Sequence, residues 1–216
     1  MDKERYILAQ RKIDAWCLML EARYQAHGRM WYQNAHTFAK ELAKMYDISL
    51  EKVCGIIAVL SPQNRWGTNK RDAEAMCKAY AAKIDLKRIV VATYPQQKAK
   101  AIAILNDAAD YDDIADMVAG PRGLKTRAFF DNIHRPNTSQ AVTIDRWMLR
   151  GFGLGQFVIY PALYRFVEKA LQDKARTLGY RPHELQAAMW VCIQETANRE
   201  NWDDSRPTYK ADELPF

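Results

Sequence analysis

The chain has 216 residues, of which 49% are hydrophobic and 27% are charged, with nine glycines and eight prolines. This balance is typical of a folded protein with one domain or two closely packed lobes, and it excludes disordered and fibrous chains. The longest apolar run, around Gly55 to Leu60, is far shorter than the roughly 20 residues that cross a bilayer. The N-terminus lacks the profile of a signal peptide, so we expect a cytoplasmic protein that does not enter a membrane.

The net charge of +6 comes from lysine and arginine residues that are spread along the whole chain. Such a charge suits a polyanionic partner, although many ordinary proteins are equally basic. The cysteines lie far apart and show no C-x-x-C spacing, which predicts buried free thiols and neither a zinc site nor an iron–sulfur cluster. They are Cys17, Cys54, Cys77 and Cys192.

Apolar side chains recur at three- and four-residue spacing along nearly the whole chain, which predicts an all-α fold. The first helix is predicted at 2–26, with His27-Gly28 as its end. The others are predicted at 30–46, 50–60, 68–83, 96–106, 114–118, 124–134, 146–152, 161–178 and 182–198. Helix 50–60 is apolar almost all round and is expected at the centre of its lobe, with Ser49 as its cap. Residues 89–93 form the only β-like run, and 201–216 are expected to be an irregular tail.

Residues 117–130 contain a glycine-rich turn between two predicted helices, with Gly120 and Gly123 as its glycines. Such a turn leaves backbone N–H groups exposed at a helix N-terminus, where they bind phosphate. Three cationic residues flank the turn, namely Arg122, Lys125 and Arg127. The pattern predicts a phosphate-binding hairpin, with a plain turn between two helices as the alternative.

An extended apolar run at 141–144 leads to Asp145, which stands at the first turn of a predicted helix. An acid at this position caps free N–H groups and is favoured by the helix dipole. Taken alone, Asp145 is therefore interpreted as an N-cap.

Together, these two segments resemble the helix-hairpin-helix DNA glycosylases, the superfamily of endonuclease III and of the adenine, alkyl-base and oxoguanine glycosylases. In that superfamily a glycine-rich hairpin is followed by Lys-Thr in the members with lyase activity. A segment similar to Val-Asp-Thr-His comes next, and its aspartate is catalytic. Lys125-Thr126 and Asp145 stand at these positions, at nearly the family spacing.

The resemblance also extends upstream, so that it covers roughly residues 50–155. Gly55 to Asn64 is similar to the family's buried helix and its Leu-Ser-x-Gln loop. Tyr94 and Lys98-Ala99 are similar to its Tyr-x-x-Lys-Ala helix start, with one extra residue between them. Four ordered elements at compatible spacing are more specific than any one of them.

Three features depart from the family pattern. The hairpin is one residue longer, Arg146 and Trp147 replace the usual Thr-His after the aspartate, and the four-cysteine cluster motif is absent. The flanks look more like small phage-associated or bacterial antiphage members of the superfamily, some of which act on hypermodified bases.

The resemblance implies a DNA glycosylase that removes a damaged or hypermodified base from double-stranded DNA. A fixed carboxylate near C1′ stabilises the positive charge that develops on the sugar, which is the role assigned to Asp145. The Lys125 amine would attack C1′ and add strand cleavage, or it would bind phosphate or stay solvated instead.

A base must leave the helical stack to be excised, and a side chain must then fill the gap. Gln63 matches the family's inserting residue, with Asn64 beside it as a further DNA contact and Trp66 as a second wedge or stacking partner. The alternatives are a polar turn residue for Gln63 and a core anchor for Trp66. The predicted base pocket is lined by the aromatic residues Trp31, Tyr32 and Trp147. The alternative is that these side chains pack in the core.

We expect two helical lobes, residues 50–134 with the hairpin and residues 1–49 plus 135–216, with Lys125 and Asp145 in the cleft between them. The protein is expected to act as a monomer without an organic cofactor, and the resemblance implies at most a monovalent cation bound by hairpin carbonyls. Two other functions remain open. One is a non-catalytic DNA-binding module, and the other is a phage transferase that modifies a DNA base and leaves the sugar bond intact.

Overall fold

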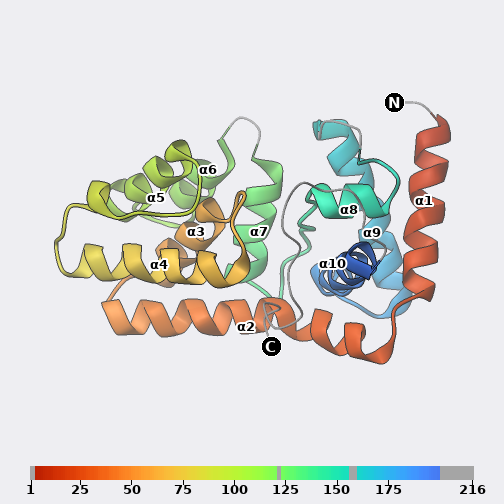
Figure 1. The fold of residues 1–216 in the computed structure, drawn as a ribbon, viewed down its shortest axis with the longest axis horizontal. Coiled ribbons are helices and arrows are strands. Elements are labelled where there is room, and N and C mark those ends of the chain that lie inside the picture. Colours follow the sequence, from red (N-terminus) through yellow and green to blue (C-terminus); the bar gives the residue numbers. More distant parts are fainter. Residues whose placement is uncertain (1–2, 121–122, 156–159, 200–216) are drawn as a thin grey trace. The chain divides into compact units, whose positions relative to one another are not determined.

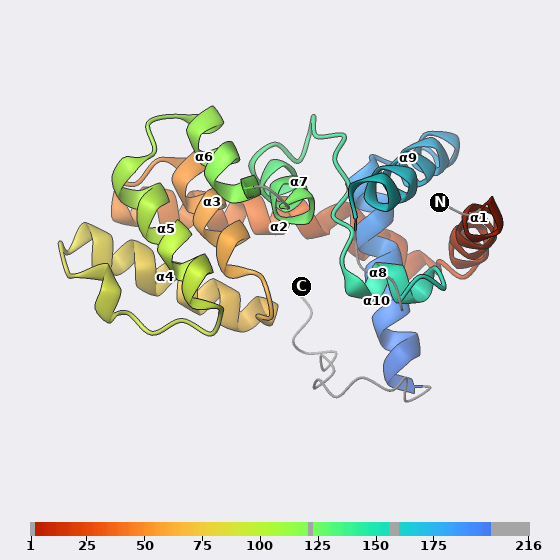
Figure 2. The same ribbon diagram turned by 90° about the horizontal axis from the view of Figure 1, so that it is seen from above.

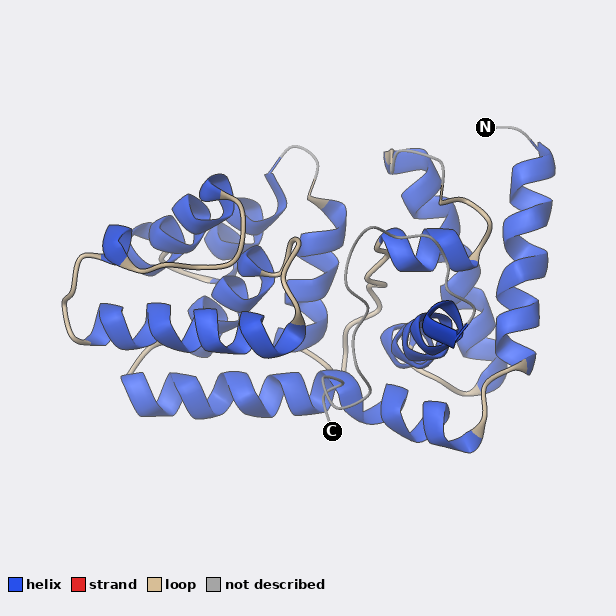
Figure 3. Ribbon diagram, viewed as in Figure 1, coloured by secondary structure: helices blue, strands red, loops and turns tan. Residues whose placement is uncertain are grey.

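The computed structural model describes residues 3–120, 123–155 and 160–199. These residues form α-helices, one short 3-10 helix and loops, and no strand is present among them (Figure 3). The fold class is therefore all-α, as the sequence predicted. The helices are α1 (Lys3–Leu18), α2 (Ala22–Tyr46), α3 (Leu50–Leu60), α4 (Trp66–Ala81), η1 (Leu86–Arg88), α5 (Pro95–Asp107), α6 (Tyr111–Ala119), α7 (Leu124–His134), α8 (Arg146–Gly151), α9 (Pro161–Leu178) and α10 (Pro182–Arg199).

The chain divides into two compact units. Unit 2 contains residues 33–137, and unit 1 contains the described residues up to Tyr32 and from Thr138 onward. Residues 33–49, which the sequence assigned to the other lobe, thus belong to the unit that carries the hairpin. They belong to it because the second half of α2 has hydrogen-bond partners in α7 and α4. The His36 imidazole Nδ1 lies 2.8 Å from the Ile133 carbonyl, and the Tyr46 hydroxyl donates to Glu74 at 3.4 Å.

Helix α3 is the centre of unit 2, as its apolar sequence predicted. Helices α4, α5, α6 and α7 all pack against it (Figures 1 and 2), and every residue from Val53 to Leu60 is buried. The helix begins where the Ser49 hydroxyl accepts a hydrogen bond from the Lys52 N–H at 3.3 Å. Gly55 allows α6 to approach closely, because a Cβ atom there would lie 2.6 Å from Ile114.

Helix α10 is the centre of unit 1, where α1, α8 and α9 pack against it. The Trp16 indole of α1 donates to the Gly151 carbonyl at the end of α8, at 2.7 Å. Gly151 in turn lets α8 approach α10, because a Cβ atom there would lie 2.5 Å from the Ile193 side chain. These contacts fix the short helix α8 on the longer helix α10.

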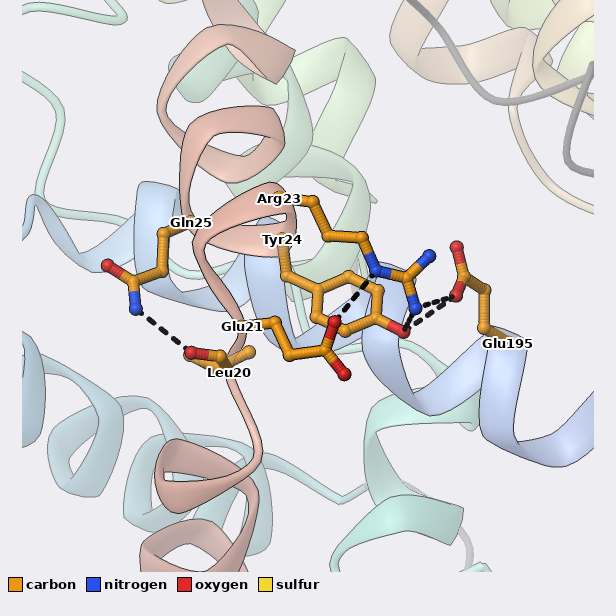
Figure 4. Close-up of polar contacts among 6 residues, drawn as sticks. All are labelled: Leu20, Glu21, Arg23, Tyr24, Gln25 and Glu195. Carbon is orange, nitrogen blue, oxygen red and sulfur yellow. Dashed lines mark hydrogen bonds and ion pairs between the residues drawn. The ribbon is translucent and has the colours of Figure 1, made fainter.

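The predicted helix end at His27-Gly28 is wrong, because α1 already ends at Leu18 and α2 runs through Gly28. Gly28 serves close packing instead. A Cβ atom there would lie 2.5 Å from the Glu184 carbonyl oxygen of α10. The true break between the helices is held by the Gln25 side chain, which donates to the Leu20 carbonyl at 2.9 Å (Figure 4).

The β-like run at 89–93 forms a loop after η1. Its hydrogen bonds go to α4 and to the loop before α4 rather than to a partner strand. The Ala92 N–H donates to Asp72 at 2.8 Å, and the Thr93 hydroxyl donates to the Pro62 carbonyl at 2.8 Å. The Val90 side chain is 89% exposed, so the run does not supply a core strand. The tail predicted at 201–216 lies outside the described residues.

The cysteines are free thiols, and Cys54, Cys77 and Cys192 are buried as predicted, whereas Cys17 is half-buried. Burial raises the pKa of Cys17 to about 11 and that of Cys77 to about 12, which keeps both thiols protonated at neutral pH. Over the described ranges, no group of three or more histidine, cysteine, aspartate or glutamate side chains could hold a metal ion, and no helix has the length and apolar character to cross a membrane.

Candidate functional site

The hairpin between α6 and α7 needs both of its glycines. Gly120 ends α6 with a φ of 52°, a left-handed conformation that side chains rarely adopt. Gly123 begins α7 in close contact with the end of α6, because a Cβ atom on it would lie 1.7 Å from the Ala119 carbonyl oxygen. The residues between them, including the predicted DNA contact Arg122, lie outside the described part of the chain.

The start of α7 carries the other predicted hairpin residues. Gly123 gives α7 no side-chain cap, and Lys125 and Thr126 are half-buried in its first turn. Arg127, a predicted DNA contact, also has an intramolecular partner. Its Nε atom forms an ion pair with Asp131 at 3.1 Å, and the Tyr111 hydroxyl of α6 donates to the same carboxylate. Arg127 therefore helps to join α7 to α6.

Lys100 of α5 also reaches the hairpin, and the sequence did not single it out. Its ammonium donates to the Val118 carbonyl at 3.1 Å and lies 3.0 Å from the position that a Cβ atom on Gly120 would occupy. Burial lowers the pKa of Lys100. Carbonyls at a helix C-terminus carry partial negative charge, so this ammonium stabilises the end of α6.

Gln63 lies in a strained and well-anchored loop between α3 and α4. It is exposed and has a φ of 58°, which is uncommon for a residue with a side chain. The Asn64 side chain beside it donates to the Leu60 carbonyl at 3.2 Å and to the Asp72 carboxylate at 2.9 Å. The loop thus holds Gln63 at the surface, as an inserting residue requires. The anchoring role of Asp72 was missed, because no local pattern marks it.

Two other predicted DNA contacts have structural roles. Trp66 is 7% exposed and packs edge-on against Phe38, with a distance of 6.4 Å between ring centres. The burial of Trp66 favours the alternative, a core anchor, over a second wedge. Asn64 fixes the loop through its side-chain amide, as described above, so the structure favours a supporting role for it.

Asp145 is the N-cap of α8 in unit 1, and its carboxylate is fixed by a hydrogen bond to each oxygen. Oδ1 accepts from the Met148 N–H at 2.9 Å, and Oδ2 accepts from the Trp190 indole of α10 at 2.8 Å. The residue is half-buried. Because each carboxylate oxygen can accept more than one hydrogen bond, the group keeps acceptor capacity for a substrate or a water molecule.

The segment that leads to Asp145 is anchored by two buried tyrosines. The Tyr164 hydroxyl donates to the Val142 carbonyl at 2.6 Å. The Tyr32 hydroxyl lies 2.9 Å from the Thr143 hydroxyl and 3.0 Å from the Gln186 amide oxygen. These bonds hold the extended segment inside unit 1 and so set the position at which α8 begins.

The three predicted base-pocket aromatics differ in burial. Trp31 and Tyr32 are buried in unit 1 and pack edge to face, with 4.7 Å between ring centres. Core packing, the alternative interpretation, therefore describes them. Trp147 of α8 is half-buried, and the Arg150 guanidinium lies 5.3 Å from its ring centre. Of the three, Trp147 remains the candidate for contact with a base.

The structure places the candidate residues in both units. Lys125 and Gln63 belong to unit 2, whereas Asp145 and Trp147 belong to unit 1. The predicted meeting of Lys125 and Asp145 in one cleft stays a prediction.

A family of unknown function, DUF7178, matches residues 4–197. The chain belongs to this family. The DUF7178 match spans both units and includes the hairpin, the Gln63 loop and Asp145. No curated protein and no solved structure is significantly similar to the chain.

Proposed function

We propose that this DUF7178 protein is a DNA glycosylase that removes a non-standard base, damaged or hypermodified, from double-stranded DNA. The Asp145 carboxylate carries the proposal. Two hydrogen bonds fix it at the start of α8, and it keeps acceptor capacity. Cleavage of an N-glycosidic bond develops positive charge on the sugar, and a carboxylate that is already in position stabilises that charge without reorganising.

Unit 2 supports DNA as the partner. Its hairpin depends on two glycines, carries Lys125 in the following turn and receives a further ammonium group from Lys100. Gln63 is presented at the surface by a loop that other side chains hold in place. The net charge of +6 favours association with a polyanion.

In the proposed reaction, the base rotates out of the duplex and Gln63 fills the gap that it leaves. The bond between C1′ and the base nitrogen breaks, and the base departs with the bonding electrons. Asp145 stabilises the cationic sugar and orients a water molecule, which adds its oxygen to C1′, and the proton that this water loses neutralises the departing base. The products are a free base and an abasic site, which supports a place in DNA repair, antiphage defence or phage DNA metabolism.

Mass spectrometry of the bases released from a panel of DNAs tests this proposal. The panel contains normal, oxidised, alkylated, hydroxymethylated and glucosylated bases. We expect one class of modified base to appear free in solution. Binding without release would indicate a DNA-binding module, and a mass change in the intact DNA would indicate a transferase.

Lys125 is expected to form a Schiff base with C1′ after attack by its amine. Borohydride reduces such an adduct to a permanent bond between protein and DNA. We expect a trapped adduct with the wild-type protein and none with Lys125→Ala. Release of free base without a trapped adduct would contradict the lyase role, and Lys125 would then be assigned to contacts with the DNA backbone.

Lys100→Met is expected to weaken DNA binding about tenfold, because it removes a positive charge beside the hairpin together with the hydrogen bond that holds the end of α6. Lys100→Arg retains this charge. Because burial lowers the pKa of Lys100, wild-type affinity should fall as the pH rises through that lowered pKa and the ammonium is lost. The DNA affinity of both proteins is measured as a function of pH at constant salt. A fall in affinity of equal size in Lys100→Met would contradict the role of Lys100.

A further inference from the structure

Helix α10 carries a row of hydrogen-bonding side chains inside unit 1. Its members follow one another at three- and four-residue spacing, so they lie on one face of the helix. They are His183, Gln186, Trp190 and Gln194. Buried polar groups are costly unless they are hydrogen-bonded, so each member of this row needs a partner.

Two members of the row have their partners at or near Asp145. The Gln186 amide oxygen lies 3.0 Å from the Tyr32 hydroxyl, which also contacts Thr143. The Trp190 indole donates to Asp145 itself at 2.8 Å. This face of α10 is therefore turned toward the segment that positions the proposed catalytic carboxylate.

Gln194 differs from these two. Its side chain is 3% exposed, yet within the described part of the chain neither its amide oxygen nor its amide nitrogen has a hydrogen-bond partner. The next residue shows the contrast. Glu195 accepts a hydrogen bond from the Tyr24 hydroxyl at 2.6 Å and forms an ion pair with Arg23 at 3.1 Å (Figure 4).

The position of Gln194 links it to the proposed active site. Residues four apart on a helix are neighbours, and helical side chains lean toward the N-terminus of their helix. The Gln194 side chain therefore leans toward the turn of α10 that carries Trp190, the residue bonded to Asp145. In the proposed reaction Asp145 lies near C1′, and the base is attached to that same atom. A group one helical turn from Trp190 is thus placed to meet the base.

We propose that the side-chain amide of Gln194 binds the polar edge of the extruded base and so determines which bases are released. This inference rests on the proposed glycosylase function. A glutamine amide has one acceptor and two donors in a plane, which matches a nucleobase edge with a neighbouring donor and acceptor. The ligand class is therefore a base with such an edge, and a base without one lacks this contact.

The amide is held for a ligand at the expense of stability in the free protein. Gln194→Met keeps the length of the side chain and removes its polar atoms. We expect this variant to melt about 4 °C higher than the wild type, because it no longer buries unused hydrogen-bonding groups.

Gln186→Met is the matched control. Gln186 lies on the same helix and is 4% exposed, but its amide oxygen has a partner in Tyr32. We expect this variant to melt several degrees lower than the wild type, because it leaves the Tyr32 hydroxyl without that acceptor. Opposite signs for the two substitutions are the expected result. A lower melting temperature for Gln194→Met would overturn the inference, because the amide would then have a stabilising partner in the free protein.

Binding of free bases gives a second readout that does not depend on catalysis. Adenine, guanine, cytosine, uracil and 5-hydroxymethylcytosine are added separately at millimolar concentration, and melting is followed. We expect at least one of them to raise the melting temperature of the wild type and none to raise that of Gln194→Met. Equal stabilisation of the two proteins, or no stabilisation of the wild type, would overturn the role of Gln194.

The two proposals fail in different ways. Stabilisation that requires Gln194, without base release from any DNA, would retain the base site and overturn the glycosylase activity. Base release with the same rates and the same preference among bases in Gln194→Met would retain the glycosylase and overturn the specificity role. If both proposals hold, Gln194→Met lowers the preference for the released base over its non-polar isostere about tenfold or more.

Discussion

Asp145→Asn is expected to lower the rate of base release about a thousandfold, because it removes the charge that stabilises the cationic sugar. The substitution also disturbs the cap of α8. An amide offers one acceptor oxygen, whereas the carboxylate accepts from Met148 on one oxygen and from Trp190 on the other. We therefore expect a loss of about 1 kcal/mol in the free energy of unfolding. DNA affinity should stay within a few-fold of the wild type, because the hairpin is unchanged.

Asp110→Asn is a control for the loss of a capping charge at a position without a proposed role in catalysis. Asp110 is the N-cap of α6, and its carboxylate accepts from the backbone N–H groups of Asp112 at 2.9 Å and Asp113 at 3.0 Å. Both bonds go to Oδ1, an oxygen that asparagine retains, so this control should lose less stability than Asp145→Asn and keep its activity. Single-turnover release from the same duplex, measured below both melting temperatures, compares the two variants. Full activity in Asp145→Asn, or equal losses in both variants, would contradict the catalytic assignment.

The helices and two of their caps could be predicted from the sequence because their causes are local. The apolar spacing of residues 50–60 identified the central helix of unit 2, and Ser49 caps it as expected. Asp145 is the N-cap that its position before an apolar helix indicated. In each case the residues that determine the structure lie within one or two turns of one another.

Other features could not be predicted because they depend on contacts between distant residues. Gly28 was interpreted as a helix end, but it lies within a helix and makes room for the Glu184 carbonyl of α10. Trp66 follows a polar loop and was a plausible wedge, yet it is buried and packs edge-on against Phe38 of α2. Lys100 reaches Val118 from another helix. Glycine, tryptophan and lysine each suit several environments, and only the tertiary packing selects among them.

The unpartnered amide of Gln194 is also invisible in the sequence. Helical spacing places the residue on one face of α10 with Gln186, and the two side chains are chemically identical. Only the structure shows that, among the residues it describes, the Gln186 amide has a hydrogen-bond partner and the Gln194 amide has none. The information that distinguishes a stabilising glutamine from one held for a ligand lies in the surroundings of the side chain.

Gly123→Ala is expected to destabilise the hairpin strongly. The new methyl group would lie 1.7 Å from the Ala119 carbonyl oxygen, a backbone atom that cannot move without displacing the end of α6. We expect a loss of about 3 kcal/mol in the free energy of unfolding, at the upper end of the usual cost of overpacking. Because the hairpin is the proposed DNA-binding element, affinity should fall at least about tenfold at constant salt, even where the protein is still folded.

Gly67→Ala is the matched control, because a Cβ atom at that exposed position in α4 would meet nothing within 4 Å. Alanine is the better helix former, so this variant should gain about 0.5 kcal/mol and bind DNA as the wild type does. Urea unfolding and DNA titration at one salt concentration test both variants. If Gly123→Ala loses stability but binds DNA with unchanged affinity when folded, the hairpin is only a turn between two helices. Unfolded protein lowers the apparent affinity by itself. If the affinity of Gly123→Ala falls by more than its unfolded fraction accounts for, the DNA contact lies at the junction of α6 and α7.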